Sequence, residues 1–336
     1  MPSTNEENAE LTAVVLNDTS YSNHHGCRVV MRSLLSGLRD VGIKVTATAP
    51  VGTPWWLTPN FMEHCFGCDV IIINGEGTIH HGAHAAENLL KITEAASVYK
   101  IPVCLINTIY QDNPEMWGNY LRKLSYVSVR DSASYDHCRD LFPDTRFCAD
   151  IALTSAPQPM AKIKKKYSFC DSVVKETSQA IEHLYKIYRD HAYYIPIRTL
   201  KKNIGDDIEI AQRATNYRFE KKYAIQHLID PNRLLFDEHE AYCKCLSSTQ
   251  LHVTGRFHSA CFAIAAGVPF VAIESNAYKI QALTYDIGLS PRRLASSISR
   301  SEIDDIPSWI FSDAEMLAIK TFLADHRQRF LDMMTD

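Results

Sequence analysis

Residues 251–267 read LHVTGRFHSACFAIAAG, and this stretch has the pattern of a strand, a turn and a helix. A short apolar run leads into a turn at Thr254-Gly255, and the small residues of 259–266 suit a tightly packed helix. In an open α/β sheet, ligands bind beyond the carboxyl ends of the strands, where the N–H groups of the next helix point outward. Arg256 and His258 lie on this turn, so the pattern indicates an anion site. Taken singly, each residue also has a structural explanation: Arg256 as a surface ion-pair partner, and His258 as a residue at the start of a helix.

The rest of the chain repeats this alternation of strand and helix. Apolar runs predict strands at residues 12–16, 44–49, 69–74, 102–107, 126–129, 167–170, 192–197, 234–236 and 268–273. Helical patterns lie between them at 27–41, 85–99, 114–124, 174–189, 207–215, 241–246 and 279–285. The pattern predicts an α/β protein with two Rossmann-like domains facing across a cleft, the arrangement called GT-B.

A stretch rich in Pro and Lys, residues 157–166, divides the two halves and reads as a linker. The expected organisation is an N-terminal Rossmann-like domain over 1–156 and a C-terminal one over 167–300. A helical tail over 301–336 is expected to pack back across the domains.

Polar residues gather after the first strand, where a ligand is expected. Asp18 follows the strand, and Asn23, His24 and His25 precede the first long helix. Helix capping is the competing explanation, but a cap needs only one of these residues.

A second group follows the strand at 69–74. Gly75 and Gly77 allow the backbone to approach a ligand, and Glu76 stands where a general acid or base is useful. A tight turn also explains this glycine pattern. His80 belongs to the same loop, and Arg130 follows a later strand at the same expected edge of the sheet.

Composition narrows the classes of function. The chain has 46% hydrophobic and 22% charged residues, typical of a globular protein, and a net charge of -4, which gives no argument for nucleic-acid binding. The start of the chain does not resemble a signal peptide, and no run of 18 apolar residues occurs. We therefore expect a cytoplasmic protein.

Metal ligands do not occur at a characteristic spacing. Cys65 and Cys68 form a CxxC without a matching second pair, and Cys243 and Cys245 form a lone CxC. His80, His81 and His84 have no Asp or Cys nearby on their loop. The expectation from the sequence is therefore no metal and no cofactor.

Several segments, in order along the chain, resemble the polysaccharide pyruvyl transferase family. They are DVIIINGEGT at 69–78, VSVRDSASYDHC at 127–138, CADIAL at 148–153, VTGRFHSACFAIAAGVPFVAI at 253–273 and, finally, YKI at 278–280 with DIGL at 286–289. Members of this family have a GT-B-like fold and move pyruvate from phosphoenolpyruvate onto a sugar as a ketal. The resemblance therefore implies phosphoenolpyruvate as donor and a glycan or lipid-linked saccharide of a cell-surface polysaccharide as acceptor. It also implies peripheral association at the inner membrane or with other polysaccharide-synthesis enzymes.

The resemblance also implies roles for individual residues. Arg130, Arg256 and His258 are expected to bind the donor anion, assisted by Lys279 and the Gly75 and Gly77 backbone. Guanidinium groups suit this task because they form paired hydrogen bonds with phosphate and carboxylate.

The proton transfers of ketal formation need acids and bases. His258 is expected to bind phosphate or to supply a proton, since imidazole does either near neutral pH. Glu76, Asp18, His24 or His25 is expected to activate the acceptor hydroxyl. Asn23 and His80, with the two histidines, form the expected acceptor site.

Two other functions remain open from the sequence, because the loop expected to meet the acceptor or donor departs from the family's pattern. The family's first loop usually reads Asn-x-Gly followed by an acidic residue, whereas this chain has Asn23-His24-His25-Gly26-Cys27. The first alternative is a GT-B glycosyltransferase that uses a nucleotide sugar in capsule or lipopolysaccharide synthesis, with residues 237–240 at the ribose. The second is a non-catalytic member of a capsule-assembly complex.

Overall fold

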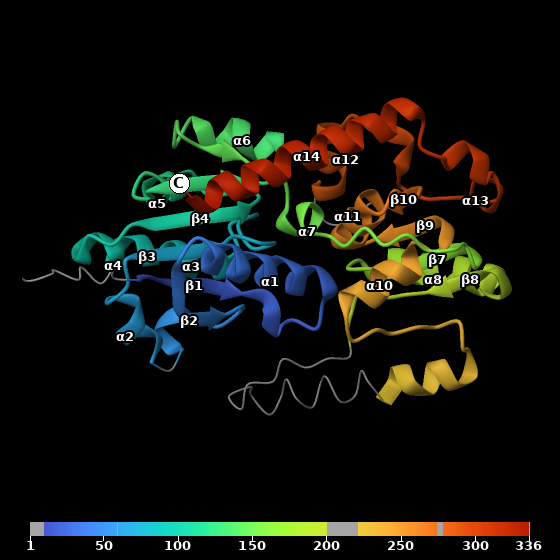
Figure 1. Ribbon diagram of the computed structural model, residues 1–336, viewed down its shortest axis with the longest axis horizontal. Coiled ribbons are helices and arrows are strands. Elements are labelled where there is room, and N and C mark those ends of the chain that lie inside the picture. The colour runs from blue at the N-terminus through green and yellow to red at the C-terminus, as the bar shows by residue number, and fades with distance from the viewer. Residues whose placement is uncertain (1–9, 59, 200–220, 274–277, 336) are drawn as a thin grey trace, which may run out of the picture. The chain divides into compact units, whose positions relative to one another are not determined.

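The computed structural model describes residues 10–58, 60–199, 221–273 and 278–335 (Figure 1). The chain divides into two compact units. Unit 1 comprises the described parts of 1–19, 31–148 and 331–336, and unit 2 those of 20–30 and 149–330. Each unit is a Rossmann-like domain with a parallel sheet and helices.

Unit 1 contains a six-stranded parallel sheet in the order β2-β1-β3-β4-β5-β6. Its strands are β1 (Leu11–Asp18), β2 (Ile43–Pro50), β3 (Val70–Asn74), β4 (Val103–Thr108), β5 (Tyr126–Val129) and β6 (Arg146–Phe147). The chain leaves β1 on one side for β2 and returns on the other side at β3. Such a reversal of strand order opens a crevice at the carboxyl ends of the two strands. In unit 1 these ends are Asp18 and Asn74.

Helices from the first part of the chain connect these strands. They are η1 (Thr19–Tyr21), α1 (His25–Asp40), η2 (Trp55–Leu57), α2 (Phe61–Cys65), α3 (His84–Leu90), α4 (Ile92–Tyr99), η3 (Glu115–Trp117), α5 (Gly118–Leu121) and α6 (Ser132–Arg139). After β6, α7 (Ile151–Thr154) belongs to unit 2. Runs of Val, Ile and Leu on the central strands are fully buried, as expected for a sheet covered on both faces.

Unit 2 contains a five-stranded parallel sheet in the order β11-β10-β9-β7-β8. Its strands are β7 (Lys165–Ser172), β8 (Ala192–Tyr194), β9 (Thr249–Gly255), β10 (Phe270–Ile273) and β11 (Leu294–Ala295). The strand order reverses between β7 and β9, so Ser172 and Gly255 end the two strands at a second switch point.

The helices of the second half complete the described chain. They are α8 (Lys175–Tyr188), η4 (Arg189–His191), α10 (His239–Leu246), α11 (Phe257–Ala265), α12 (Lys279–Ile287), η5 (Pro291–Arg293), α13 (Arg300–Asp304), η6 (Ile306–Trp309) and α14 (Asp313–Thr335). None of the described helices combines the length and the apolar content needed to cross a bilayer.

The observed elements differ from the sequence-based expectation in several places. The segment 85–99 forms two helices rather than one, and 114–124 forms only the short η3 and α5. Residues 234–236 do not form a strand but make isolated bridges, Tyr194 with Arg233 and Thr199 with Phe236. The helix expected over 207–215 lies outside the described residues.

The domain boundaries also differ from the expected ones. Residues 20–30, which we placed in the N-terminal domain, group with unit 2, and residues 331–336 of the expected tail group with unit 1. β7 begins at Lys165, so the last two residues of the expected linker are strand.

A buried ion pair fixes the start of α14 within unit 2. Arg293 donates from Nε and Nη2 to the two carboxylate oxygens of Glu315, each at 2.9 Å. The same guanidinium donates to the Trp309 carbonyl at 2.9 Å and lies 4.0 Å from the ring centre of Phe311. The hydrogen bond from Arg293 holds the pKa of Glu315 at about 2, below its usual 4.5.

This pair leads to a pH-dependent prediction for stability. Glu315→Gln should lower the free energy of unfolding by about 3 kcal/mol at neutral pH, because Arg293 is then left buried without its anion. A depressed carboxyl pKa stabilises the fold above the unfolded-state value and loses this effect as pH falls from 4.5 towards 2. Urea unfolding at about pH 7 and about pH 3 should therefore show a smaller difference between variant and parent at the lower pH.

The exposed pair of Asp325 and Arg329 gives the matched control. Asp325→Asn should change stability by at most about 1 kcal/mol at either pH. An effect of Glu315→Gln no larger than that of the control contradicts the prediction.

Candidate functional site

The turn after β9 holds Arg256 against a carboxylate on the neighbouring strand. A β-carbon on Gly255 would lie 2.4 Å from Cβ of Ser172, so only glycine lets the ends of β9 and β7 meet so closely. This contact brings Arg256 to Asp171, which accepts hydrogen bonds from Nε at 2.9 Å and from Nη2. Arg256 also occupies the cap position of α11. Asp171 therefore fixes the direction of the guanidinium.

Arg256 lines a polar cavity of about 330 Å³ in unit 2. Four cationic side chains and two carboxylates border it: Arg198, Lys222, Arg233, Arg256, Asp171 and Glu182. The lining has an excess of two positive charges, which favours an anionic ligand.

Arg233 forms the fixed wall of this cavity. It donates to Glu182 at 2.8 Å and lies 5.0 Å and 4.8 Å from the ring centres of Tyr185 and Tyr194. Arg198 and Lys222, in contrast, are exposed at the rim. Exposed cations at the rim are well placed to meet an incoming anion.

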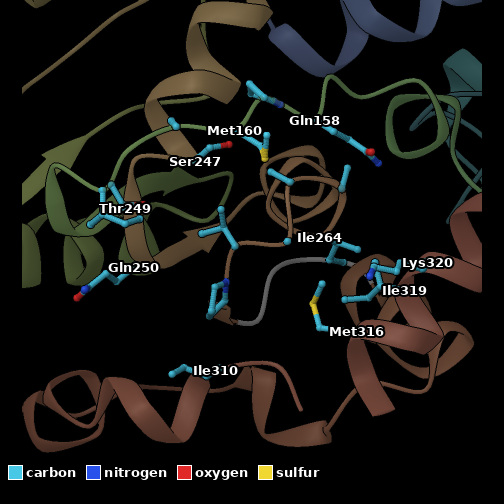
Figure 2. A pocket seen from close by; sticks show the side chains of 18 of the residues that line it. Gln158, Met160, Ser247, Thr249, Gln250, Ile264, Ile310, Met316, Ile319 and Lys320 are labelled. Atoms are coloured by element: carbon cyan, nitrogen blue, oxygen red, sulfur yellow. The ribbon is translucent and has the colours of Figure 1, made fainter. Parts of the chain in front are cut away.

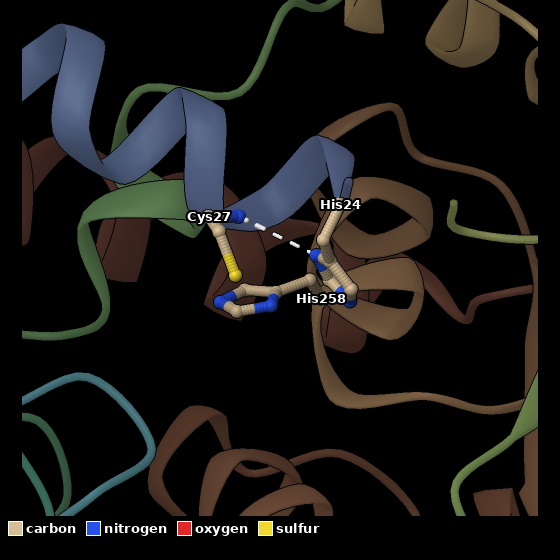
Figure 3. Close-up of side chains that lie close together, drawn as sticks. All are labelled: His24, Cys27 and His258. Carbon is tan, nitrogen blue, oxygen red and sulfur yellow. Dashed lines mark hydrogen bonds between the residues drawn. The ribbon is translucent and has the colours of Figure 1, made fainter. Parts of the chain in front are cut away.

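His258 lies beside the first turn of α1 (Figure 3). Its ring is 5.1 Å from that of His24, and its Nε2 is 3.7 Å from Oδ1 of Asp150. A β-carbon on Gly26 would lie 2.2 Å from Cγ of His258. Since such a distance is not tolerated, glycine at position 26 is required for this approach.

The two histidines before Gly26 have different surroundings. His24 is half-buried and accepts hydrogen bonds at Nδ1 from the backbone N–H of Gly26 and Cys27. His25 is fully buried, 5.0 Å from the Tyr242 ring, and neither ring nitrogen has a hydrogen-bond partner among the described residues. Burial, and then the neighbouring His258 for His24 and His24 for His25, lowers the pKa of both well below the usual range. His25 is therefore enclosed within unit 2, whereas the sequence-based prediction placed it in the acceptor site.

A chain of buried hydrogen bonds runs behind α11. Tyr242 bonds to Ser259 at 2.7 Å, and Ser259 bonds to Nε2 of His252 at 2.7 Å. Nδ1 of His252 bonds to Ser168 at 2.8 Å, and burial lowers the pKa of His252 to about 3. A neutral imidazole with both nitrogens bonded fixes the start of α11 from the side of the core.

In unit 1, polar side chains close the crevice between β1 and β3. Asn17, in the left-handed conformation with φ of 62°, donates to the Asn74 carbonyl at 2.7 Å and to Thr78 at 3.1 Å. Thr19 donates to Oε2 of Glu76 at 2.6 Å, and Glu76 is buried. The Glu76 carboxylate therefore lies at the switch point, where residues at or just after the ends of β1 and β3 are joined by hydrogen bonds.

The glycine loop after β3 has a structural explanation. A β-carbon on Gly75 would lie 2.3 Å from Cβ of Thr108, and Gly77 has a positive φ of 64°. The Thr108 carbonyl accepts the N–H of Arg130 at 2.9 Å, so Arg130 and Gly75 share one edge of the sheet through Thr108. Nε2 of His80 forms a hydrogen bond of 3.0 Å with the Gly77 carbonyl.

The expected site residues fall into two groups. Asp18, Gly75, Glu76, Gly77, His80 and Arg130 lie in unit 1, whereas Asn23, His24, His25, Arg256, His258 and Lys279 lie in unit 2. Asp18 is buried at the end of β1, and Lys279 is half-buried at the start of α12. The Asn23 carbonyl accepts the N–H of Thr199 at 3.3 Å.

Sequence reasoning missed Asp171, Arg198, Arg233 and Cys27 as members of the unit 2 site. Asp171 follows the expected strand 167–170 directly, and this strand-end position is the one signal for it. In the loop after β2, Trp55 is buried, whereas Trp56 is 40% exposed.

Another cavity of unit 2, about 670 Å³, is lined mainly by apolar side chains (Figure 2). Ile264, Ile310, Met316 and Ile319 line it, and among the described lining residues Lys320 alone is charged. Neither Arg256 nor His258 borders it, so it adds nothing to the chemistry of the turn after β9.

Comparison with known families gives a clear result. A family model described as "Polysaccharide pyruvyl transferase" matches residues 4–276. The chain belongs to this family. It is therefore a transferase, and the matched range includes every expected site residue except Lys279. Among curated protein sequences, none matches the chain.

Solved structures with the same fold include sugar-nucleotide enzymes. S. aureus MnaA bound to UDP has 10% identity, 97% coverage of this chain, 98% coverage of that chain and a TM-score of 0.55. An alpha-glucosyltransferase in complex with UDP and a 13-mer DNA has 10% identity, coverages of 98% and 100% and a TM-score of 0.51. The UDP-GlcNAc 2-epimerase from Methanocaldococcus jannaschii has 9% identity, coverages of 93% and 99% and a TM-score of 0.51. At these identities the likeness shows the fold alone, the GT-B-like pair of Rossmann-like domains expected from the sequence.

The contact between Gly26 and His258 predicts the effect of one methyl group. Gly26→Ala should lower the free energy of unfolding by about 1 to 3 kcal/mol, the usual cost of overpacking. Alanine within α1 would by itself favour the helix by roughly 0.5 to 1 kcal/mol, so a net loss reports the clash. Urea unfolding followed by far-ultraviolet circular dichroism measures the change.

Gly67→Ala is the control for this substitution. A β-carbon there would meet the Glu63 carbonyl at 3.5 Å, an ordinary contact, and should leave stability within about 0.5 kcal/mol. Equal stability of the Gly26→Ala protein and its parent would show that the helix start and His258 do not pack as described.

Proposed function

We propose that this transferase moves pyruvate from phosphoenolpyruvate onto a sugar of a cell-surface polysaccharide or its lipid-linked precursor, forming a ketal. The family match over residues 4–276 is the observation that carries the proposal. The cationic cavity beside Arg256 supports it, because phosphoenolpyruvate carries both a phosphate and a carboxylate.

The unit 2 turn supplies the groups that the donor needs. Asp171 accepts hydrogen bonds from Nε and Nη2 of Arg256, and these bonds fix the plane of the guanidinium. Nη1 of the same group and the exposed side chains of Arg198 and Lys222 then bind the anion. A guanidinium that is already oriented loses less conformational entropy when the donor arrives.

The reaction balances without a cofactor. A proton is added to the methylene carbon of phosphoenolpyruvate, and the oxygen of one sugar hydroxyl bonds to the adjacent carbon while that hydroxyl loses its proton to a base. The bond from that carbon to the phosphate oxygen breaks, and inorganic phosphate leaves. A second hydroxyl of the sugar then bonds to the same carbon and closes the ketal, releasing its proton.

His258 is the proposed phosphate ligand or proton donor in this scheme. Glu76 and Asp18 are the proposed bases for the acceptor hydroxyls, and both are buried at the switch point of unit 1. A buried carboxylate held by a hydroxyl donor, as Glu76 is by Thr19, has the fixed position that general-base catalysis requires.

Donor identity is tested by titration calorimetry of the purified chain. Phosphoenolpyruvate should bind, and UDP-glucose should not. Phosphate release from phosphoenolpyruvate with a panel of glycans then tests transfer. Binding of UDP-glucose without binding of phosphoenolpyruvate would replace the proposal with a nucleotide-sugar glycosyltransferase, and binding of neither donor with no turnover supports a non-catalytic partner.

A pair of variants tests how Arg256 acts. Arg256→Ala should weaken phosphoenolpyruvate binding by roughly 10- to 150-fold, because a charge-assisted hydrogen bond contributes about 1.5 to 3 kcal/mol. Part of this loss arises because the substitution leaves Asp171 facing the donor. The double variant Arg256→Ala with Asp171→Asn separates the two effects: affinity should stay well below that of the parent.

Full recovery of affinity in the double variant would mean that Arg256 only neutralises Asp171 and does not touch the donor. Arg329→Ala, which removes an exposed cation paired with Asp325 outside the polar cavity, is the control and should leave affinity unchanged.

A further inference from the structure

Three metal-ligating side chains meet at the start of α1 and the start of α11. His24, Cys27 and His258 each place one ligand atom so that all three lie within 4.8 Å of one another (Figure 3). All three residues belong to unit 2. His24 and Cys27 are half-buried and His258 is buried, so the cluster is partly removed from solvent.

Local structure explains why these atoms converge. His24 and Cys27 are three residues apart at the beginning of a helix, so their side chains lie on the same face. Gly26, between them, has no β-carbon and lets the His258 ring pack directly against this turn. The contacts to Nδ1 of His24, at 3.2 and 3.4 Å, are long for hydrogen bonds and cost little to give up.

The ligand set suits zinc. Thiolate sulfur and imidazole nitrogen are the usual zinc ligands, with bond lengths of about 2.3 Å and about 2.0 to 2.1 Å. In a tetrahedral site these lengths place ligand atoms about 3.3 to 3.8 Å apart. Atoms that are already within 4.8 Å need only small side-chain movements to reach this spacing.

The carboxylate of Asp150 lies close to His258, one member of the cluster. Oδ1 of Asp150 is 3.7 Å from Nε2 of His258 and accepts the N–H of Ala152 at 2.8 Å, which fixes its position. A carboxylate on the second nitrogen of a ligating histidine orients the ring and makes it a better ligand. Asp150 is therefore suited to an outer-shell role.

We propose that His24, Cys27 and His258 form a zinc site, with Asp150 orienting His258. Binding converts the Cys27 thiol to a thiolate and releases its proton to solvent. Three protein ligands leave the fourth zinc position open, which is the pattern of catalytic rather than structural sites. An oxygen of an anionic substrate is the class of ligand that this position takes.

The site does not depend on the identity of the donor. With zinc bound, His258 is a ligand and holds no proton to give, so the proton for a donor carbon would come from another group. The metal then supplies the positive charge at this point of the unit 2 site. The proposal differs from the expectation of no metal, which rested on the cysteine pairs at 65 and 68 and at 243 and 245 and on the histidines of residues 80–84, and did not consider these three ligands together.

Metal binding is measured directly on the full chain. The protein is purified with its affinity tag removed, stripped with a chelator, and titrated with Co²⁺ as a spectroscopic substitute for Zn²⁺. One Co²⁺ per chain should bind and produce a thiolate-to-cobalt charge-transfer band together with visible bands of tetrahedral cobalt. Competition with Zn²⁺ should abolish these bands.

Variants assign the ligands. Cys27→Ser should abolish the charge-transfer band, and His24→Ala should weaken binding by more than the roughly 10- to 100-fold that loss of an outer-shell partner costs. Asp150→Asn should weaken binding within that 10- to 100-fold range. Circular dichroism of each stripped variant distinguishes loss of metal from loss of fold.

Two controls address other sites in the described chain. Cys245→Ser removes a half-buried thiol outside the cluster and should leave the charge-transfer band intact. His239→Ala disrupts Glu238-His239-Glu240, the other described group with metal-binding spacing, and should leave the stoichiometry at one. Retention of the band in folded Cys27→Ser, or its absence from the parent protein, would overturn the proposal, whatever the result with phosphoenolpyruvate.

Discussion

The unit 2 site depends on the absence of one β-carbon, at Gly26. The first turn of α1 meets the His258 ring at a distance that no other residue permits. This contact joins a segment near the N-terminus to the turn after β9, although more than half of the chain separates them in sequence. It places His24 and Cys27 beside His258, and it buries His25 against Tyr242. The chemistry proposed for this part of the molecule therefore follows from a packing constraint.

A second constraint acts on the same turn from the core. His252 is fully buried and uses both ring nitrogens in hydrogen bonds with Ser168 and Ser259. Burying a polar ring is favourable only when its hydrogen bonds are made, so this network favours one arrangement of β7, β9 and α11. The residue before Ser259 is His258, and its backbone position follows from that arrangement. The backbone that carries His258 is thus fixed by the polar network of His252, and its ring packs against the first turn of α1 at Gly26.

Much of the fold was predictable from the sequence because its signals are local. The strand at 126–129 has the same bounds in the structure, and the runs at 69–74 and 102–107 differ by a residue. The prediction of one helix over residues 85–99 was wrong because a second helix begins at Ile92, and no Pro or Gly in the sequence marks this break. Residues 234–236 failed as a strand because a short apolar run does not show whether a neighbouring strand is available to pair.

The site was predictable only where residues stand at strand ends. This rule found Arg256, Glu76 and Arg130, but it assigns no partners, and the bond from Arg256 to Asp171 joins residues 85 apart in sequence. The role expected for His25 depended on exposure, which tertiary packing removed. Cys27 was missed although His24 stands three residues before it, because the third member of the group, His258, lies on a distant segment. Spacing rules for metal sites detect sets of ligands on one segment and miss those that the fold completes from a second.

The ion pair between Arg256 and Asp171 has two effects: it orients the guanidinium group, and it lowers the affinity of that group for an anion. A carboxylate on the guanidinium competes with an anionic ligand and reduces the affinity that the positive charge would give alone. The same carboxylate fixes the two nitrogens it contacts, so the remaining nitrogen of the fork points in one direction. For the proposed pyruvyl transfer, this arrangement limits how tightly released phosphate is held, and tight binding of the product would slow the cycle. The cavity lining as a whole keeps an excess of two positive charges, which favours an anionic ligand although Arg256 itself is partly neutralised.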